Sequence, residues 1–242
     1  MSNLGSFFIS NIALVTSVFF LCASDVEAAS IEYGSFDNGW YDENGRHIAD
    51  NKNVVTGYLG STSKRYNSFH VFDISFLTGP IDQAFLRFLP NNGDYRGGSG
   101  QTLNIYSVTT DIAALLTSNP EYSPAGQQIY NDLQSGNLLG SALVTGIDNQ
   151  AMPEVLIELN SVALAELNHA ISLGEDSFGF GASLLSPAFG EVLWAFSDGG
   201  GSSSNLRLVG DNVELPPPVP LPASLFLLLG AIFAVGSVRR FS

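Results

Sequence analysis

Basic residues and cysteine are scarce in this chain of 242 residues. Lysine and arginine together number 9 against 23 aspartates and glutamates, so the formal net charge is −14. Because a nucleic-acid backbone binds basic surfaces and repels acidic ones, we exclude nucleic acid as a partner. The single cysteine, Cys22, excludes a disulfide framework within the chain and a zinc site built from cysteines.

The common catalytic motifs are also missing. The three histidines, His47, His70 and His169, form neither an HExxH motif nor a His-x-His pair, and we find no G-x-S-x-G elbow and no P-loop. His70 lies among bulky apolar residues, which is typical of a structural imidazole. Carboxylate pairs of the glycosidase kind are available in any chain this acidic and therefore indicate nothing. We expect a protein that is not an enzyme.

Alternation of apolar and polar residues over many short segments predicts the fold. Hydrophobic residues make up 45% of the chain, which is enough to bury a core. Phe69 and Val71 lie on one face of such a segment, and Phe72 and Ile74 lie on the other. We predict an all-β fold, an antiparallel β-sandwich or jelly-roll-like domain over residues 31–214. Strands are expected at residues 54–58, 68–74, 84–89, 103–108, 155–159, 177–183, 192–197 and 205–209.

Two short helices are expected as covers at the ends of the sandwich. The first spans residues 111–116. The second spans residues 161–172, with Asn160 as its N-cap and Gly174 as its stop.

Large side chains alternate with glycines over residues 177–182. Phe178 and Phe180 are expected to point into the core. Gly179 and Gly181 then leave a bare opposite face, where another backbone or a flat ligand can approach closely.

The N-terminus has the pattern of an export signal. Residues 7–23 form an apolar run, and Val26 and Ala28 are the short residues that a signal peptidase requires. We predict a signal peptide over residues 1–28 that is cleaved after Ala28. The alternative is an N-terminal membrane anchor that stays attached, since the first 30 residues contain no lysine or arginine.

The C-terminus has the pattern of a membrane anchor. Residues 215–222 form a proline-rich linker, and residues 219–238 contain no charge. A helix of 20 residues spans roughly 30 Å, the thickness of the hydrocarbon core of a bilayer. We predict a transmembrane helix with a basic tail over residues 223–242, in which Arg239 and Arg240 stop transfer and hold the end in the cytoplasm. The alternative is a buried core helix.

Val219-Pro220-Leu221-Pro222-Ala223 comes directly before the apolar segment, and Arg239 and Arg240 follow it. This tail resembles the PEP-CTERM class of sorting signals, in its VPLPA variant. The resemblance covers about 24 residues and lies in a proline-containing motif, an apolar helix and the terminal arginine pair. It implies a Gram-negative bacterium, an exosortase as processing partner, and delivery to the envelope or outside, often alongside exopolysaccharide production. Residues 66–74, 160–170 and 194–209 in the middle of the chain also resemble the β-sandwich domains of such proteins in their pattern. The motif that the enzyme would recognise consists of Val219, Pro220, Leu221, Pro222 and Ala223.

One polar stretch near the N-terminus of the domain holds the candidate ligands for calcium, the only cofactor we consider. Asp37, Asp42 and Asn44 supply the oxygen atoms that calcium prefers, although the stretch does not match the EF-hand loop.

Aromatic residues near the same stretch are candidates for carbohydrate binding. Trp40 and Tyr41 lie within it, and Tyr95 lies in a glycine-rich loop. Exposed aromatic rings stack on sugar rings. The alternative is that Trp40 packs over the end of the sheet.

The sequence as a whole therefore predicts an exported, non-enzymatic protein of the cell surface or extracellular matrix. Its precursor is anchored in the inner membrane until an exosortase processes it. Two other functions stay open. One is a carbohydrate-binding module that acts on exopolysaccharide, and the other is a polysaccharide-degrading enzyme.

Overall fold

A computed structural model describes residues 30–88, 94–97, 100–145, 155–195 and 204–210. This part of the chain consists mainly of antiparallel strands, as the sequence predicts, and each of the eight expected strands is present. The strands are β1 (Ser30–Gly34), β2 (Asp37–Asp42), β3 (Val54–Leu59), β4 (Lys64–Asp73), β5 (Gln83–Phe88), β6 (Asp94–Arg96), β7 (Gln101–Ser107), β8 (Leu138–Val144), β9 (Val155–Glu158), β10 (Ser177–Leu184), β11 (Val192–Ala195) and β12 (Ser204–Val209). The helices are α1 (Ile112–Leu115), α2 (Pro124–Asp132) and α3 (Ser161–Leu173).

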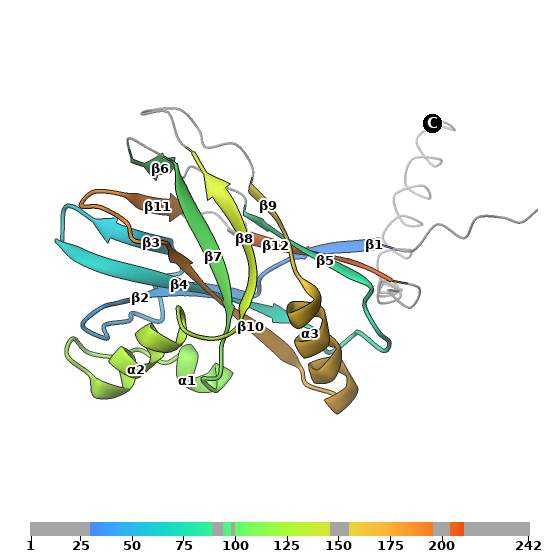
Figure 1. Cartoon of the computed structure of the whole chain (residues 1–242). Helices are drawn as coiled ribbons and strands as arrows, with labels where there is room; N and C mark the ends of the chain where they lie inside the picture. Colours follow the sequence, from blue (N-terminus) through green and yellow to red (C-terminus); the bar gives the residue numbers. More distant parts are fainter. Residues whose placement is uncertain (1–29, 89–93, 98–99, 146–154, 196–203, 211–242) are drawn as a thin grey trace, which may run out of the picture.

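The strands form two sheets in a sandwich-like arrangement (Figure 1). The smaller sheet has the order β1-β12-β5-β9. The larger sheet has the order β6-β11-β3-β4-β10-β7-β8, and β2 pairs with β4 outside this path. Residues far apart in the sequence become neighbours in this way, since β10 pairs with both β4 and β7.

The main hydrophobic core lies between the two sheets. Leu86 and Leu206 contribute to it from the smaller sheet, and Phe72, Phe180 and Ile105 from the larger one. Each of these side chains is almost fully buried. Burial of one such side chain contributes about 2 kcal/mol, so this layer is the main source of stability.

The two sheets approach each other where β8 crosses β9. A Cβ added to Gly140 would lie 2.8 Å from a methyl carbon of Ile157, so only glycine permits this approach. The backbone N–H of Asn160 donates to the carbonyl of Leu139 at 2.8 Å, and the Asn160 side chain caps α3 by accepting from Val162 and Ala163. The predicted N-cap and the left-handed stop at Gly174 are both confirmed.

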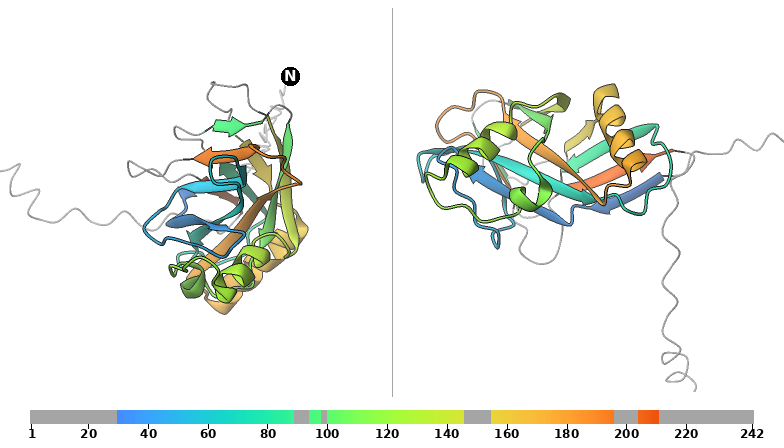
Figure 2. Two further views of the ribbon diagram at one scale, coloured as in Figure 1. Left: turned by 90° about the vertical axis from the view of Figure 1, so that its left-hand side faces the viewer. Right: turned by 90° about the horizontal axis from the view of Figure 1, so that it is seen from below.

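A second hydrophobic core lies on the opposite face of the larger sheet. Phe69 and Val71 of β4 pack there against Leu115 of α1 and Ile129 of α2. Because Phe72 and Ile74 belong to the main core, β4 is covered on both faces, as its alternation predicts. Helix α1 therefore packs on a sheet face, against β10, and not at an end of the sandwich as expected. Helix α3 lies apart from α1 and α2 (Figure 2).

Five described elements were not predicted from the sequence: helix α2 and strands β1, β2, β6 and β8. Helix α2 was not predicted, because its sequence is polar and offers only Ile129 and Tyr130 as large buried residues. Its capping residues are nevertheless visible in the sequence, with Ser123 as N-cap and Pro124 in the first turn. The polar stretch that begins at Asp37 forms β2, and the expected glycine-rich loop contains β6.

Candidate functional site

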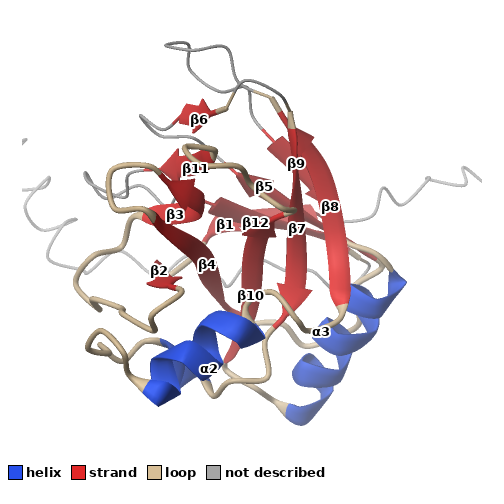
Figure 3. Ribbon diagram, turned by 60° about the vertical axis from the view of Figure 1, so that its left-hand side comes forward, coloured by secondary structure: helices blue, strands red, loops and turns tan. Residues whose placement is uncertain are grey.

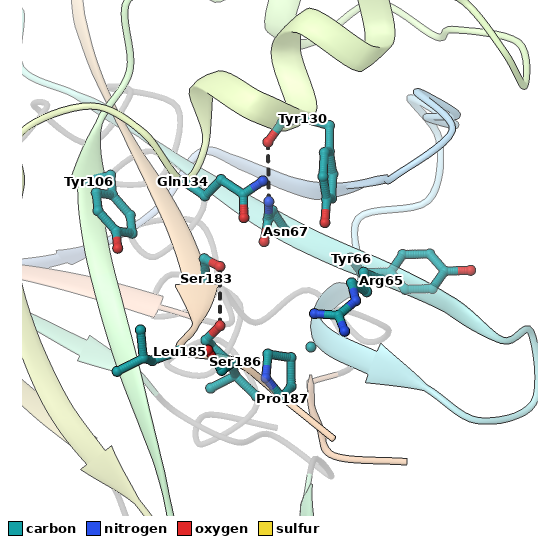
Figure 4. A pocket seen from close by; sticks show the side chains of 12 residues that line it. Arg65, Tyr66, Asn67, Tyr106, Tyr130, Gln134, Ser183, Leu185, Ser186 and Pro187 are labelled. Carbon is teal, nitrogen blue, oxygen red and sulfur yellow. Dashed lines mark hydrogen bonds between the residues drawn. The ribbon is translucent and has the colours of Figure 1, made fainter. Parts of the chain in front are cut away.

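A pocket of about 410 Å³ opens on the outer face of the larger sheet, beside the C-terminal end of α2 (Figure 4). Its lining residues come from strands β3, β4, β7 and β10, from helix α2, and from the segments that follow α2 and β10. Figure 3 shows α2 at one end of strands β4 and β10. This volume is within the range of small-molecule sites. The lining residues are Gly57, Arg65, Tyr66, Asn67, Tyr106, Tyr130, Gln134, Ser183, Leu184, Leu185, Ser186 and Pro187.

The alternation of β4 places two polar side chains in the pocket. Successive residues of a strand point to opposite faces, so Arg65 and Asn67 lie on the same face as Phe69. Phe69 is covered by the helices, whereas Arg65 and Asn67 lie beyond them and line the pocket. The Asn67 side chain donates to the carbonyl of Tyr130 at 3.1 Å, which ties the strand to α2. Tyr66 points the other way and packs against Trp40 (Figure 4).

On one face of strand β10, Gly181 presents no side chain, and Ser183, two residues further along, presents a hydroxyl. A Cβ on Gly181 would lie 2.5 Å from the carbonyl oxygen of Leu133, so the segment after α2 lies directly on the strand. This confirms the expectation that the bare glycine face admits another backbone. Two residues further along, that segment no longer covers β10, and Ser183 lines the floor of the pocket.

Two tyrosines flank this floor. Tyr106 of β7 and Tyr130 of α2 lie on opposite sides of Asn67 and Ser183 (Figure 4). The Asn104 side chain donates to the Tyr106 hydroxyl at 3.1 Å and thereby orients the ring. Burial raises the pKa of the Tyr130 hydroxyl to about 12, with a further contribution from the charge of Glu43. The hydroxyl stays protonated at neutral pH and can donate a hydrogen bond.

A turn after β10 forms the rim of the pocket. Ser186 has a positive φ of 50°, a conformation that few residues other than glycine adopt. Leu185 is 56% exposed and Phe189 is 64% exposed, so the rim presents apolar side chains to solvent. Phe189 packs edge-on against Tyr58 of β3, with 5.3 Å between the ring centroids.

The three aromatic residues expected to bind carbohydrate do not offer exposed rings. Trp40, Tyr41 and Tyr95 are all buried. Trp40 packs against Tyr66, and the Tyr41 hydroxyl donates to the carbonyl of Leu115 at 2.9 Å. The expectation of an exposed aromatic surface is therefore corrected at these positions. Alternation along β2 predicts that one of the neighbours Trp40 and Tyr41 is exposed. Both are buried, because both faces of this strand are covered.

The carboxylates that were candidates for calcium form ion pairs with lysines. Both oxygens of Asp37 accept from the ammonium group of Lys52 at 2.7 Å. Asp42 is buried, and it accepts from Lys64 at 2.9 Å and from two backbone N–H groups. Asn44 donates to Glu121 instead of joining the aspartates. Among the residues that the structure describes, no group of three or more His, Cys, Asp or Glu is arranged for a metal ion.

The sorting motif, both arginines of the basic tail and the signal peptide lie outside the described residues. Within the described ranges, no helix combines the length and the apolar character needed to cross a bilayer. The predicted helix over residues 223–242 belongs to the part that is not described.

Two histidines are buried inside the domain. His70 lies between the sheets, with Nδ1 2.8 Å from the Ser204 hydroxyl and its ring edge-on to Phe88. Burial lowers its pKa to about 3. The ring of His47 stacks on Tyr41, and burial lowers its pKa as well. Both imidazoles lie apart from the pocket lining, which agrees with a structural role for His70.

Sequence reasoning did not identify the pocket residues. Tyr106 and Ser183 were placed in predicted strands without a role, and Tyr130 and Gln134 belong to a helix and a following segment that were not expected. The available signal was the outward position of Arg65, Asn67, Tyr106 and Ser183 on their alternating strands.

Comparisons with known proteins give few likenesses. No family model matches the chain, and no curated protein matches it. Among solved structures, the K3 adhesin domain of Lys-gingipain from Porphyromonas gingivalis is similar with a TM-score of 0.32 and 10% identity, covering 75% of this chain and 97% of that one. Xylanase 10B (CBM22-1 and GH10 modules) from Clostridium thermocellum is similar with a TM-score of 0.27 and 8% identity, covering 78% of this chain and 30% of that one.

Proposed function

We propose that the domain is the glycan-binding part of an exported, non-enzymatic protein of the cell surface or extracellular matrix. The pocket is the observation that carries the proposal. Tyr106 and Tyr130 flank a floor of amide and hydroxyl groups from Asn67 and Ser183. Aromatic rings pack on the C–H faces of sugars, and amides and hydroxyls bind sugar hydroxyls. A lining of this kind favours a polar ligand with an apolar face.

Delivery of the domain rests on the two ends of the chain. The predicted signal peptide over residues 1–28 supports export. The resemblance of residues 219–240 to a PEP-CTERM signal supports an exosortase as partner and a membrane-anchored precursor. The excess of acidic residues suits a soluble surface domain, because net charge opposes self-association.

Replacing Tyr106 with alanine is expected to weaken glycan binding about tenfold, because a stacking partner is lost. Tyr122→Ala is the matched control, since this tyrosine is 69% exposed and does not line the pocket. The measurement is the retardation of the purified full-length chain in gels that contain the organism's own exopolysaccharide or a panel of plant and bacterial polysaccharides. Equal retardation of Tyr106→Ala and wild type would contradict the assigned site, and no retardation of wild type on any polymer would contradict the function. Reducing ends released in the same samples would indicate the enzymatic alternative.

The sorting part of the proposal has a separate test. Replacing Pro220 and Pro222 together with alanine is expected to leave the full-length form in the membrane, because the recognition motif is removed. Immunoblots of membrane and culture fractions measure the processed form. Processing at the wild-type rate would contradict a role of this motif.

A further inference from the structure

Arg65 differs from the paired basic residues of the domain. Lys52 and Lys64 each bind an aspartate, and Arg87 lies 2.8 Å from Glu32. Arg65 is exposed, and within the described ranges it forms no ion pair. It is also the one cation among the described residues that line the pocket. In a chain with 23 acidic and 9 basic residues, an unneutralised cation at the edge of a polar pocket indicates an anionic ligand.

The position of Arg65 is held by stacking. Its guanidinium carbon lies 5.0 Å from the centroid of the Tyr58 ring, and Tyr58 is supported in turn by Phe189. A guanidinium that stacks on a ring keeps its N–H donors in its own plane, free to bind the two oxygens of a carboxylate. Little side-chain entropy then remains to be lost on binding.

We propose that the glycan is acidic and that Arg65 binds the carboxylate of a hexuronate unit whose ring lies between Tyr106 and Tyr130. This inference rests on the proposed glycan-binding function. The net charge of −14 repels a polyanion at long range, but at physiological ionic strength the repulsion is screened beyond about 8 Å. The contact with Arg65 is shorter than this distance, so it decides the preference. The backbone N–H of Glu43 donates to the Arg65 carbonyl at 2.9 Å, so one acidic residue lies on the segment beside Arg65.

The test compares an acid with its own ester. The purified full-length chain is titrated calorimetrically with oligomers of galacturonate, mannuronate and glucuronate, and with the methyl ester of each. Esterification removes the charge and keeps the ring, so wild type is expected to bind one of the acids about two- to fivefold more tightly than its ester, as for a charge pair that is partly open to solvent. Arg65→Gln is expected to remove this difference and to leave the affinity for the ester unchanged.

Arg207→Gln is the matched control. Arg207 lies on β12 of the smaller sheet, and its guanidinium stacks on Phe85 with 5.9 Å to the ring centroid. The substitution removes the same charge and the same kind of stacking, so the preference for the acid should persist. Equal affinity of wild type for acid and ester would overturn the inference while leaving the glycan-binding function intact. A preference that survives in Arg65→Gln would also overturn it. Binding of neither form, nor of any neutral glycan, would instead refute the proposed function.

Discussion

Gly45→Ala is expected to lower the free energy of unfolding by more than about 2 kcal/mol, because it adds a clash to a strained conformation. Gly45 has a φ of +83° in the turn after β2. A Cβ there would lie 2.5 Å from the backbone nitrogen of Gln127 and 2.6 Å from the carbonyl oxygen of Ser123, in the first turns of α2. Backbone atoms cannot move aside as a flexible side chain can. Urea denaturation of the full-length chain, followed by tryptophan fluorescence, measures the change.

Gly174→Ala is the matched control for this prediction. Gly174 also has a positive φ, of 71°, but a Cβ there would meet nothing within 4 Å. Its substitution should cost only the conformational penalty of about 1 kcal/mol.

Gly126→Ala tests the same contact from the helix side. Alanine favours a helix by about 1 kcal/mol over glycine, yet the new Cβ would overlap the backbone of Gly45, so a net loss is expected. Equal losses in Gly45→Ala and Gly174→Ala would refute this contact. Because α2 carries Tyr130, a loosened helix should also weaken the proposed glycan binding.

His70 is expected to make the domain sensitive to acid. Burial lowers its pKa in the folded state to about 3, whereas the ordinary value is 6.5. Below pH 6.5 the unfolded chain binds a proton that the folded chain does not. Stability from this group is therefore complete above pH 6.5 and falls by about 1.4 kcal/mol per pH unit toward pH 3. His47 acts in the same direction, because burial also lowers its pKa.

His70→Gln is expected to reduce this slope, measured as the free energy of unfolding in urea at several pH values between 6.5 and 4. The substitution lowers stability at neutral pH through lost packing against Phe88, so the readout is the slope and not the absolute value. His169→Gln, at an exposed position of α3, is the control for the loss of an imidazole as such. A slope in His70→Gln that equals that of wild type would contradict the assignment.

Eight of the twelve described strands were readable from the sequence because their physical cause is local. Alternation in β4 indicated that Phe69 and Phe72 lie on opposite faces, and the structure places them in two different cores. Helix α3 was equally readable, since Asn160 and Gly174 cap it and Leu167 lies at helical spacing. The helix that was missed is α2, whose amphipathic pattern is weak and which is stabilised by the contact between Gly126 and the turn at Gly45. Strands β1, β2, β6 and β8 were also missed.

The site was not readable for a related reason. A pocket depends on which side chains remain uncovered, and this is decided by where distant segments pack. Trp40 and Tyr41 stand beside polar residues in the sequence, yet sheet pairing and the helices bury both. In the sequence, Asp37 and Asp42 resemble metal ligands. In the structure, each forms an ion pair with a lysine from later in the chain, Lys52 and Lys64 respectively.

By itself, the sequence determined eight of the twelve described strands, the antiparallel class and two of the helices, because periodicity and capping act within a few residues. It also carries the terminal segments from which export and sorting are predicted. The tertiary structure alone decided which tyrosines flank a pocket and which acids are paired with lysine. It also decided that Arg65 forms no ion pair among the described residues. Those outcomes follow from contacts between separate segments of the chain, such as the pairing of β4 with β10, and no local pattern encodes them.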